Sequence, residues 1–437
     1  MTDSFRTESD SIGPVLIPSE ALWGAQTQRA IENFPISGQP MPAEFIAALA
    51  LVKSACAHAN RALGVLPVDI GQAIIAASAE IMAGHHGDAF PIDVYQTGSG
   101  TSTNMNANEV IANLAAKAGL AVHPNDHVNM SQSSNDVIPT TIRVSAVELA
   151  CHQLLPALLH LIATLERKAT ALAGQTKMGR THLMDALPIR FDQSLMAYVD
   201  QLLGAKLGIE QALERMRALP QGGTAVGTGV NAPEGFAQAF VVALNQATRG
   251  SYRLMPWAFA GLSAQDEPVA LSAALRGLAI VLTKIANDLR LMNSGPLAGL
   301  SEISLPDLQP GSSIMPGKVN PVVPEAVAMV AAQVQGLDLS VALAGQSGLF
   351  ELNVMLPLIA NNVLQSLSLL SNAMRTLGMN PILVTALNPV IGYELGAKIA
   401  KRAYREQRAI LDVALEMTDI PEAELKRLLD PIRLTGQ

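Results

Sequence analysis

Residues 266–296 read DEPVALSAALRGLAIVLTKIANDLRLMNSGP, and this stretch decides the fold. Its large apolar side chains recur at alternating steps of four and three residues, which is the spacing of a helix-bundle seam. These positions are Leu271, Leu275, Leu278, Leu282, Ile285, Leu289 and Met292. Asp266, Glu267 and Pro268 are typical of a helix start, and residues 293–296 are typical of a helix end. We therefore predict one helix of about 28 residues, roughly 42 Å long.

Four further stretches show the same apolar spacing. One covers residues 195–216, and another begins after residue 136 and continues toward residue 172, with a kink expected at Pro156. The remaining two cover residues 327–341 and 363–377. Five long helices predict an all-α protein built on an elongated central helix bundle. Alternating strand patterns are scarce, which argues against a Rossmann fold or a barrel.

The character of the sequence changes twice and predicts three domains. Residues 1–132 are rich in prolines and loops, and we expect a mixed, mainly helical domain there. Residues 133–388 carry the long helical patterns of the bundle, and residues 389–437 are charged and predict a small C-terminal helical domain.

The composition favours a globular protein that associates with copies of itself. Charged residues make up 15% of the 437 residues and the apolar set makes up 49%, where an average soluble domain has roughly 25% charged residues. This excludes intrinsic disorder, which requires low hydrophobicity and high charge. It also predicts more apolar surface than one core can absorb, and hence a homo-oligomer.

Other features argue against several kinds of partner. The formal net charge is −8, with few clusters of Lys and Arg, so we expect no nucleic-acid partner. Uninterrupted apolar runs such as residues 45–52 have about eight residues where a membrane span needs about 20, so we expect no membrane partner. Residues 1–8 resemble neither a signal peptide nor a transit peptide. Cys56 and Cys151 form no disulfide framework, so we expect a cytoplasmic protein.

Four islands of small polar residues interrupt this apolar background. They are residues 97–106 (TGSGTSTNMN), 123–136, 179–182 (GRTH) and 311–321 (GSSIMPGKVNP). Each island alone is compatible with a capped helix start or a turn. Together, their hydroxyls, amides, backbone N–H groups and one lysine predict a cage of donors for oxyanions.

We expect neither a metal nor a cofactor at these islands. Residues 311–318 differ from a phosphate-binding loop, because five residues separate the glycines and Val319 replaces the Ser or Thr that would hold Mg²⁺. His123 and His127 lack the intervening glutamate of a zinc protease.

Four residues within or next to these islands carry reactive groups. His182 is a candidate general acid or base, and Glu325 is a carboxylate of the kind that orients a histidine. Ser312 lies in a glycine-flanked loop near Lys318, whose charge would lower the pKa of a serine or bind a carboxylate. The residues alone therefore indicate an anion-binding helical enzyme.

Residues 311–321 resemble the signature loop of the fumarase/aspartase superfamily. Residues 22–29 (LWGAQTQR), 97–113, 123–140 and 222–231 also match the family's motifs, so the resemblance covers nearly the whole chain. Within the superfamily, the chain is most similar to the class II fumarases. The resemblance implies a lyase, namely a fumarate hydratase of the tricarboxylic acid cycle. It would interconvert fumarate and L-malate without a cofactor, by anti addition and elimination through an aci-carboxylate carbanion. It also implies a homotetramer with a twenty-helix core, five long helices from each chain, and active sites shared by three subunits.

The resemblance assigns roles to individual residues. Ser312 matches the serine that takes the C3 proton of malate as an alkoxide, and His182 matches the histidine that handles water at C2, paired with Glu325. Substrate-binding positions are matched by Ser99, Thr101, Ser133, Ser134, Asn135, Thr181, Lys318 and Asn320. A secondary dicarboxylate site near the entrance is matched by His123, Asn125 and Asp126.

Two other functions stay open at this point. Ser134 and residues 181–182 resemble fumarases, whereas residues 102–103 resemble aspartases, and residues 322–324 and 355–356 depart from the usual fumarase pattern. Aspartate ammonia-lyase, which forms fumarate and ammonia from L-aspartate, is therefore the alternative. A non-catalytic, structural use of the same scaffold is the more remote one.

Overall fold

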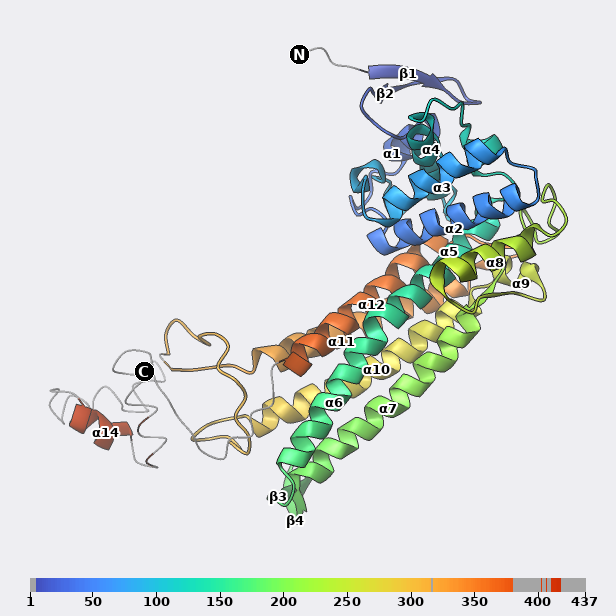
Figure 1. Ribbon diagram of the computed structural model, residues 1–437. Coiled ribbons are helices and arrows are strands. Elements are labelled where there is room, and N and C mark those ends of the chain that lie inside the picture. The colour runs from blue at the N-terminus through green and yellow to red at the C-terminus, as the bar shows by residue number, and fades with distance from the viewer. Residues whose placement is uncertain (1–4, 316, 380–401, 403–405, 407–409, 418–437) are drawn as a thin grey trace. The chain divides into compact units, whose positions relative to one another are not determined.

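The computed structural model describes residues 5–315, 317–379, 402, 406 and 410–417 (Figure 1). Most of the predicted C-terminal domain, residues 389–437, lies outside the described residues. The described part is predominantly helical, as predicted. Its helices are α1 (Ala25–Asn33), α2 (Ala43–Ala62), α3 (Val68–Met82), η1 (Gly87–Ala89), α4 (Thr101–Ala116), η2 (Pro124–Val128), α5 (Ser134–Leu149), η3 (Ala150–Leu154), α6 (Leu155–Ala171), α7 (Phe191–Met216), α8 (Phe236–Thr248), α9 (Ala258–Ser263), α10 (Asp266–Met292), α11 (Val322–Gly345), α12 (Leu356–Met379) and α14 (Ile410–Met417).

The strands form only short two-stranded pairs in the described residues. The first two elements of the chain pair antiparallel, and a second antiparallel hairpin joins α6 to α7. The strands are β1 (Phe5–Ser9), β2 (Pro14–Pro18), β3 (Thr176–Thr181), β4 (Met184–Arg190), β5 (Ala218–Leu219), β6 (Arg253–Leu254), β7 (Gly348–Leu349) and β8 (Leu352–Asn353). β7 and β8 pair antiparallel, and β5 and β6 pair parallel. These strands were not predicted from the sequence.

The five predicted long helices are all present. They are the continuous run α5–η3–α6, then α7, α10, α11 and α12. α10 begins at Asp266, as predicted, and ends at Met292, one residue before the predicted stop signal. The first six seam positions of α10 are fully buried, and the seam of α7 is also buried. The alternating apolar spacing therefore identifies the core-facing stripe of these helices.

One irregularity falls where a kink was predicted. The helix does not stop before Pro156 but passes through the π-helical turn η3, at Ala150–Leu154, and continues to Ala171. A π turn is one of the recognised causes of bending in a long helix. Residues 134–171 thus form one continuous helical run in which the π turn directly precedes the turn that contains Pro156.

Contacts divide the chain into two compact units. The first unit comprises Met1–Ala157, Gly204–Ala279 and Ala332–Asn372, and the second comprises Leu158–Leu203, Ile280–Ala331 and Ala373–Gln437. Each unit contains a segment of all five long helices. The first unit adds α1–α4, α8 and α9, where α2 packs on α3, α4, α5 and α8. The division into three sequence domains stays a prediction.

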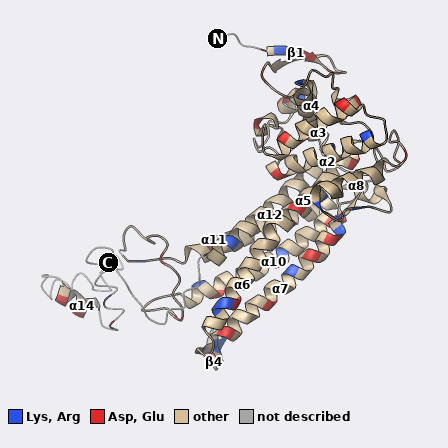
Figure 2. Ribbon diagram, in the orientation of Figure 1, with Lys and Arg blue, Asp and Glu red and all other residues tan. Residues whose placement is uncertain are grey.

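Charged residues are spread along α7 and α10 (Figure 2), whereas α11 carries two and α12 carries one. By length and composition alone, three helical stretches are apolar enough to cross a membrane, namely Ser134–Ala171, Asp266–Met292 and Val322–Gly345. Only 50%, 44% and 33% of their apolar windows are buried within this one chain. The prediction of no membrane partner was based on the length of uninterrupted apolar runs, which are short. The mean hydropathy over 18 residues, which tolerates single polar residues, is high in these three stretches.

Candidate active site

The start of α5, in the first unit, is capped by side-chain hydrogen bonds. Ser133 is the N-cap, and its Oγ accepts a hydrogen bond from the backbone N–H of Asn135 at 3.2 Å. Asp136 completes the capping box by accepting from the backbone N–H of Ser133 at 2.9 Å. Ser134 and Asn135 therefore lie in the first helical turn, where free N–H groups and the helix dipole favour an anion.

Asp136 also forms hydrogen bonds with a glycine-rich segment next to the start of α5. Its second oxygen accepts from the backbone N–H groups of Gly222 and Thr224 at 3.0 and 2.9 Å. Asn135 adds a hydrogen bond from Nδ2 to the carbonyl oxygen of Ala225 at 2.8 Å. Burial raises the pKa of Asp136 to about 6, against the lowering effect of these backbone donors.

The start of α4 supplies the second set of hydroxyls. Gly100 has a φ of +72°, and a Cβ there would lie 2.9 Å from Ile138, so this turn requires glycine. The turn brings Ser99 Oγ within 2.8 Å of Thr101 Oγ1. Of the predicted substrate-binding residues, the first unit thus carries five: Ser99, Thr101, Ser133, Ser134 and Asn135.

Asn104 links these two helix starts. Its Nδ2 donates a hydrogen bond to Ser134 Oγ at 3.0 Å, and its side chain is fully buried. This hydrogen bond therefore joins the first turn of α4 to the first turn of α5 within the first unit.

The predicted secondary site lies on the exposed turn η2. His123 is its N-cap, and His123 Nδ1 accepts from the backbone N–H of Asp126 at 3.1 Å. The backbone N–H of His123 donates to His127 Nδ1 at 2.9 Å. The side chains of His123 and Asp126 are exposed, as is Asn125.

The second unit presents His182 at the tip of a hairpin. His182 and Leu183 have φ values of +56° and +62° in the turn between β3 and β4, a left-handed conformation that few non-glycine residues adopt. Thr181 and His182 are exposed. The hairpin is held by Glu302, whose carboxylate accepts from Arg180 Nη1 at 2.6 Å and lies 3.3 Å from Lys177 Nζ.

The Ser312 loop is closed on itself by backbone and side-chain hydrogen bonds. The N–H of Gly311 donates to the carbonyl oxygen of Lys318 at 2.8 Å, and Asn320 Nδ2 donates to the carbonyl oxygen of Gly311 at 3.2 Å. Ser312 Oγ accepts from the backbone N–H groups of Ile314 and Met315 at 3.2 and 3.1 Å. These two donors favour negative charge on Oγ, which is what an alkoxide base requires.

The structure does not bring all catalytic candidates together within one chain. Glu325 lies in the first turn of α11 and is half-buried. Among the described residues, no hydrogen bond or ion pair joins Glu325 to His182, or His182 to Ser312. Residues 5–315 and 317–379 also contain no cluster of three or more His, Cys, Asp or Glu side chains that could hold a metal.

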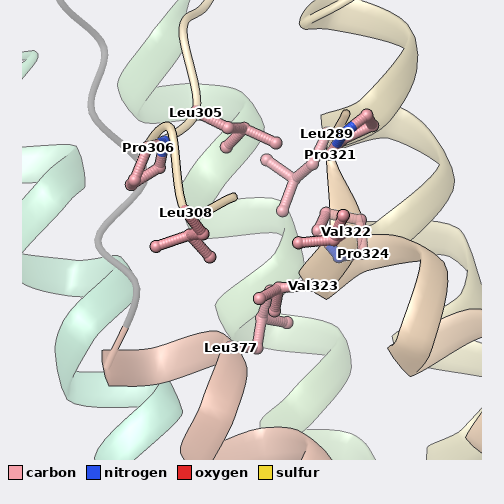
Figure 3. Close-up of a pocket in the computed structure, with 9 residues that line it drawn as sticks. All are labelled: Leu289, Leu305, Pro306, Leu308, Pro321, Val322, Val323, Pro324 and Leu377. Carbon is pink, nitrogen blue, oxygen red and sulfur yellow. The ribbon is translucent and has the colours of Figure 1, made fainter. Parts of the chain in front are cut away.

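An apolar pocket in the second unit is lined by residues that precede and follow the segment carrying Ser312 (Figure 3). It has a volume of about 20 Å³ and is enclosed entirely by apolar side chains. They are Leu289, Leu305, Pro306, Leu308, Pro321, Val322, Val323, Pro324 and Leu377. Because it offers no polar group to a dicarboxylate, we interpret it as packing that anchors both ends of the segment carrying Ser312.

Comparisons with known proteins identify the family. A family model described as "Lyase" matches residues 13–336, and one described as "Fumarase C C-terminus" matches residues 383–436. "Fumarate hydratase class II 2" of Pseudomonas aeruginosa is 54% identical, over 100% of this chain and 99% of the relative. The chain belongs to the class II fumarate hydratase family. The resemblance seen in the sequence is thereby confirmed.

Two further proteins match this chain over almost its whole length. "Fumarate hydratase class II" of Xylella fastidiosa is 53% identical, over 99% of this chain and 96% of the relative. The crystal structure of a recombinant class II fumarase from Schistosoma mansoni matches with a TM-score of 0.85 at 36% identity, and 99% of both chains is covered.

Three residues that hydrogen-bond near the candidate site residues were not predicted from the sequence: Asn104, Lys53, which donates to Asn129 and Gln132, and Glu302. Asn104 was quoted within a polar island but given no role, although an Asn-Met-Asn-Ala-Asn run in a helix is an unusual pattern that signals buried amides. Lys53 and Glu302 lie outside every island. Their partners are distant in sequence, so no local signal identified them.

Proposed function

We propose that this chain is a fumarate hydratase that interconverts fumarate and L-malate without a metal or cofactor. The observation that carries the proposal is end-to-end identity of about one half with relatives named fumarate hydratase class II. The donors gathered at the starts of α4 and α5 support it, because a dicarboxylate substrate needs several convergent donors.

Ser312 is the base in this proposal. As an alkoxide it removes the proton from C3 of L-malate, and the electron pair moves into the adjacent carboxylate to give an aci-carboxylate. The backbone donors to Ser312 Oγ favour the alkoxide. Lys318 and Asn320 with Ser134 and Asn135 stabilise the additional charge on the carboxylate, which is the logic of an oxyanion hole.

His182 completes the elimination. It protonates the departing hydroxide at C2, so that water leaves from the face opposite the lost proton and fumarate forms. Hydration follows the same path in reverse. Glu325 orients His182 and stabilises its protonated state, as a carboxylate does for a catalytic histidine. Thr181, Thr101, Ser99 and Ser133 bind the substrate.

This chemistry requires more than one copy of the chain. Because His182 and Glu325 of one chain share no contact in the described residues, we propose that they pair between subunits of a homotetramer with active sites shared by three subunits. Exposed apolar side chains on the long helices support such an assembly. They include Leu203 and Leu207 on α7 and Met329, Leu339 and Leu343 on α11.

Aspartate ammonia-lyase remains the second candidate, because residues 102–103 resemble aspartases. These side chains are occupied locally, since Ser102 Oγ lies 2.9 Å from Thr97 Oγ1 and Thr103 Oγ1 donates to Gln96 Oε1 at 2.8 Å. Leu356, another departure from the fumarase pattern, is fully buried. Local packing thus gives a reason for these differences that involves no change of substrate, and we favour fumarate hydratase.

Four further expectations belong to the proposal. The turn with His123, Asn125 and Asp126 is a secondary dicarboxylate site, and the protein acts in the cytoplasm, in the tricarboxylic acid cycle. It acts without nucleic acid or membrane partners.

Turnover and mass together test the proposal. The chelator-treated protein should release fumarate from L-malate, and Ser312→Ala should abolish this while the mass in solution remains that of four chains. Equal activity in Ser312→Ala and the unmodified protein would contradict the assigned base, and absent activity in both would favour the structural use of the scaffold. A monomer with full activity would contradict the shared site.

A further inference from the structure

Lys53 is an unusual residue in the first unit. It lies in the middle of α2 and is fully buried. Within the described residues, no Asp or Glu oxygen lies within 4.0 Å of its Nζ. Instead, Nζ donates hydrogen bonds to Asn129 Oδ1 at 3.0 Å and to Gln132 Oε1 at 2.9 Å. A buried cation held only by neutral amides is costly, so its presence calls for a role.

Lys53 fixes the orientation of the amides around it. An ammonium group only donates hydrogen bonds, so the Asn129 atom that faces it is the oxygen. This oxygen also faces Asn104 and Asn108, at 3.2 Å each, so both must present their Nδ2 groups to it. The buried lysine thereby sets the direction of three amide side chains.

The hydrogen-bond orientation that Lys53 imposes extends to the proposed substrate site. The same Nδ2 of Asn104 donates to Ser134 Oγ at 3.0 Å. Because Ser134 Oγ accepts this bond, its own hydrogen is free to donate to another group. Gln132, the second partner of Lys53, directly precedes the N-cap Ser133, so the lysine also holds the chain at the start of α5.

We propose that Lys53 is a positioning residue for the dicarboxylate site. It directs a chain of hydrogen bonds through Asn129 and Asn104 so that the Ser134 hydroxyl donates to a substrate carboxylate. Its buried positive charge also favours a dianion over a monoanion. The inference rests on the proposed function in one respect, namely that Ser134 binds the substrate.

The charges near Lys53 give the proposal a pH signature. Burial lowers the pKa of Lys53 to about 7, while Cys56 and Asp136 act in the opposite direction. A bound dianion stabilises the charged form of Lys53, so binding is accompanied by proton uptake when the free lysine is partly neutral. Affinity for a dianion should therefore fall as the pH rises through about 7.

The test is a titration of the full-length protein with succinate, a dicarboxylate that cannot undergo the elimination. We expect Lys53→Met to weaken succinate binding about ten-fold or more at pH 7, because the buried charge and the hydrogen bonds that direct the Ser134 hydroxyl are lost. The binding of Lys53→Met should weaken less between pH 6 and 8 than that of the unmodified protein, and Lys53→Arg should retain part of the affinity. Lys117→Met, which removes an exposed lysine at the end of α4, is the matched control and should change neither quantity.

A second variant keeps the inference testable if Lys53→Met does not fold. In Asn104→Asp, a carboxylate replaces the donor, so the Ser134 hydroxyl turns toward residue 104 and succinate binding should weaken at least as much. Succinate affinity within two-fold of the unmodified protein in either variant would overturn the inference. Absent turnover and absent succinate binding in the unmodified protein would instead refute the proposed function.

Discussion

Glu302 offers the sharpest test of how the His182 hairpin is held. Its carboxylate is 13% exposed and binds Arg180 and Lys177, which are 20% and 9% exposed. Removing one partner of a buried ion pair costs about 3–5 kcal/mol, whereas an exposed pair contributes less than about 1 kcal/mol. Since these groups are mostly but not fully buried, we expect Glu302→Gln to cost about 2–4 kcal/mol.

A second ion pair of Arg180, with Asp185, provides the control for this prediction. Arg180 lies 3.5 Å from Asp185, whose side chain is 74% exposed. Asp185→Asn should therefore cost no more than about 0.5 kcal/mol. Urea unfolding of the three proteins at equal chain concentration gives the free energies, and turnover of L-malate shows whether the hairpin is misplaced.

We expect Glu302→Gln to reduce turnover by about ten-fold or more, because small displacements of a catalytic group are costly. Asp185→Asn should leave turnover nearly unchanged. If Glu302→Gln and Asp185→Asn both lose only a little stability and turnover, the argument that the Glu302 contact holds the hairpin is refuted.

Three further predictions concern other parts of the chain. His182→Asn should reduce turnover far more than Ser134→Ala, because it removes acid–base catalysis worth roughly 10²–10⁴-fold; equal losses would contradict the assigned roles. Glu267→Gln should destabilise the protein by about 3 kcal/mol in thermal or urea unfolding, because Arg143 is fully buried and donates to Glu267 at 2.9 Å; a loss below about 1 kcal/mol would contradict this. The folded-state pKa of Asp136, about 6, lies above its ordinary value of 3.8, so its stabilising contribution is complete below about pH 3.8 and is lost as the pH rises through 6. The unmodified protein should thus lose stability relative to Asp136→Asn over that range, and parallel pH profiles of the two would argue against it.

The long helices were predictable because one physical feature determines them. The apolar seam of α10 and its flanking signals at Asp266 and Asn293 depend only on local sequence, and the observed bounds agree with them. Pro156 was harder, since whether a proline ends a helix depends on the packing around it, and here the helical run continues past Pro156 to Ala171. Strand β4 of the β3–β4 hairpin is almost entirely exposed, so it leaves no alternating apolar pattern in the sequence.

The candidate site was predictable where short motifs carry it and not where distant segments meet. Ser312 and His182 lie in motifs that the family resemblance identifies directly. Lys53, in contrast, stands alone in an apolar helix, and its partners follow 76 and 79 residues later. Glu302 is likewise linked to a hairpin 122 residues earlier in the chain. Such residues become visible only when the fold brings their partners together.

The most direct test of the account is a pair of absorbance assays on the purified, chelator-treated protein, with L-malate in one and L-aspartate in the other. The account predicts that fumarate appears from L-malate and not from L-aspartate. Fumarate and ammonia from L-aspartate alone would contradict it. That result would mean that the differences at residues 102–103 and 355–356 determine the substrate.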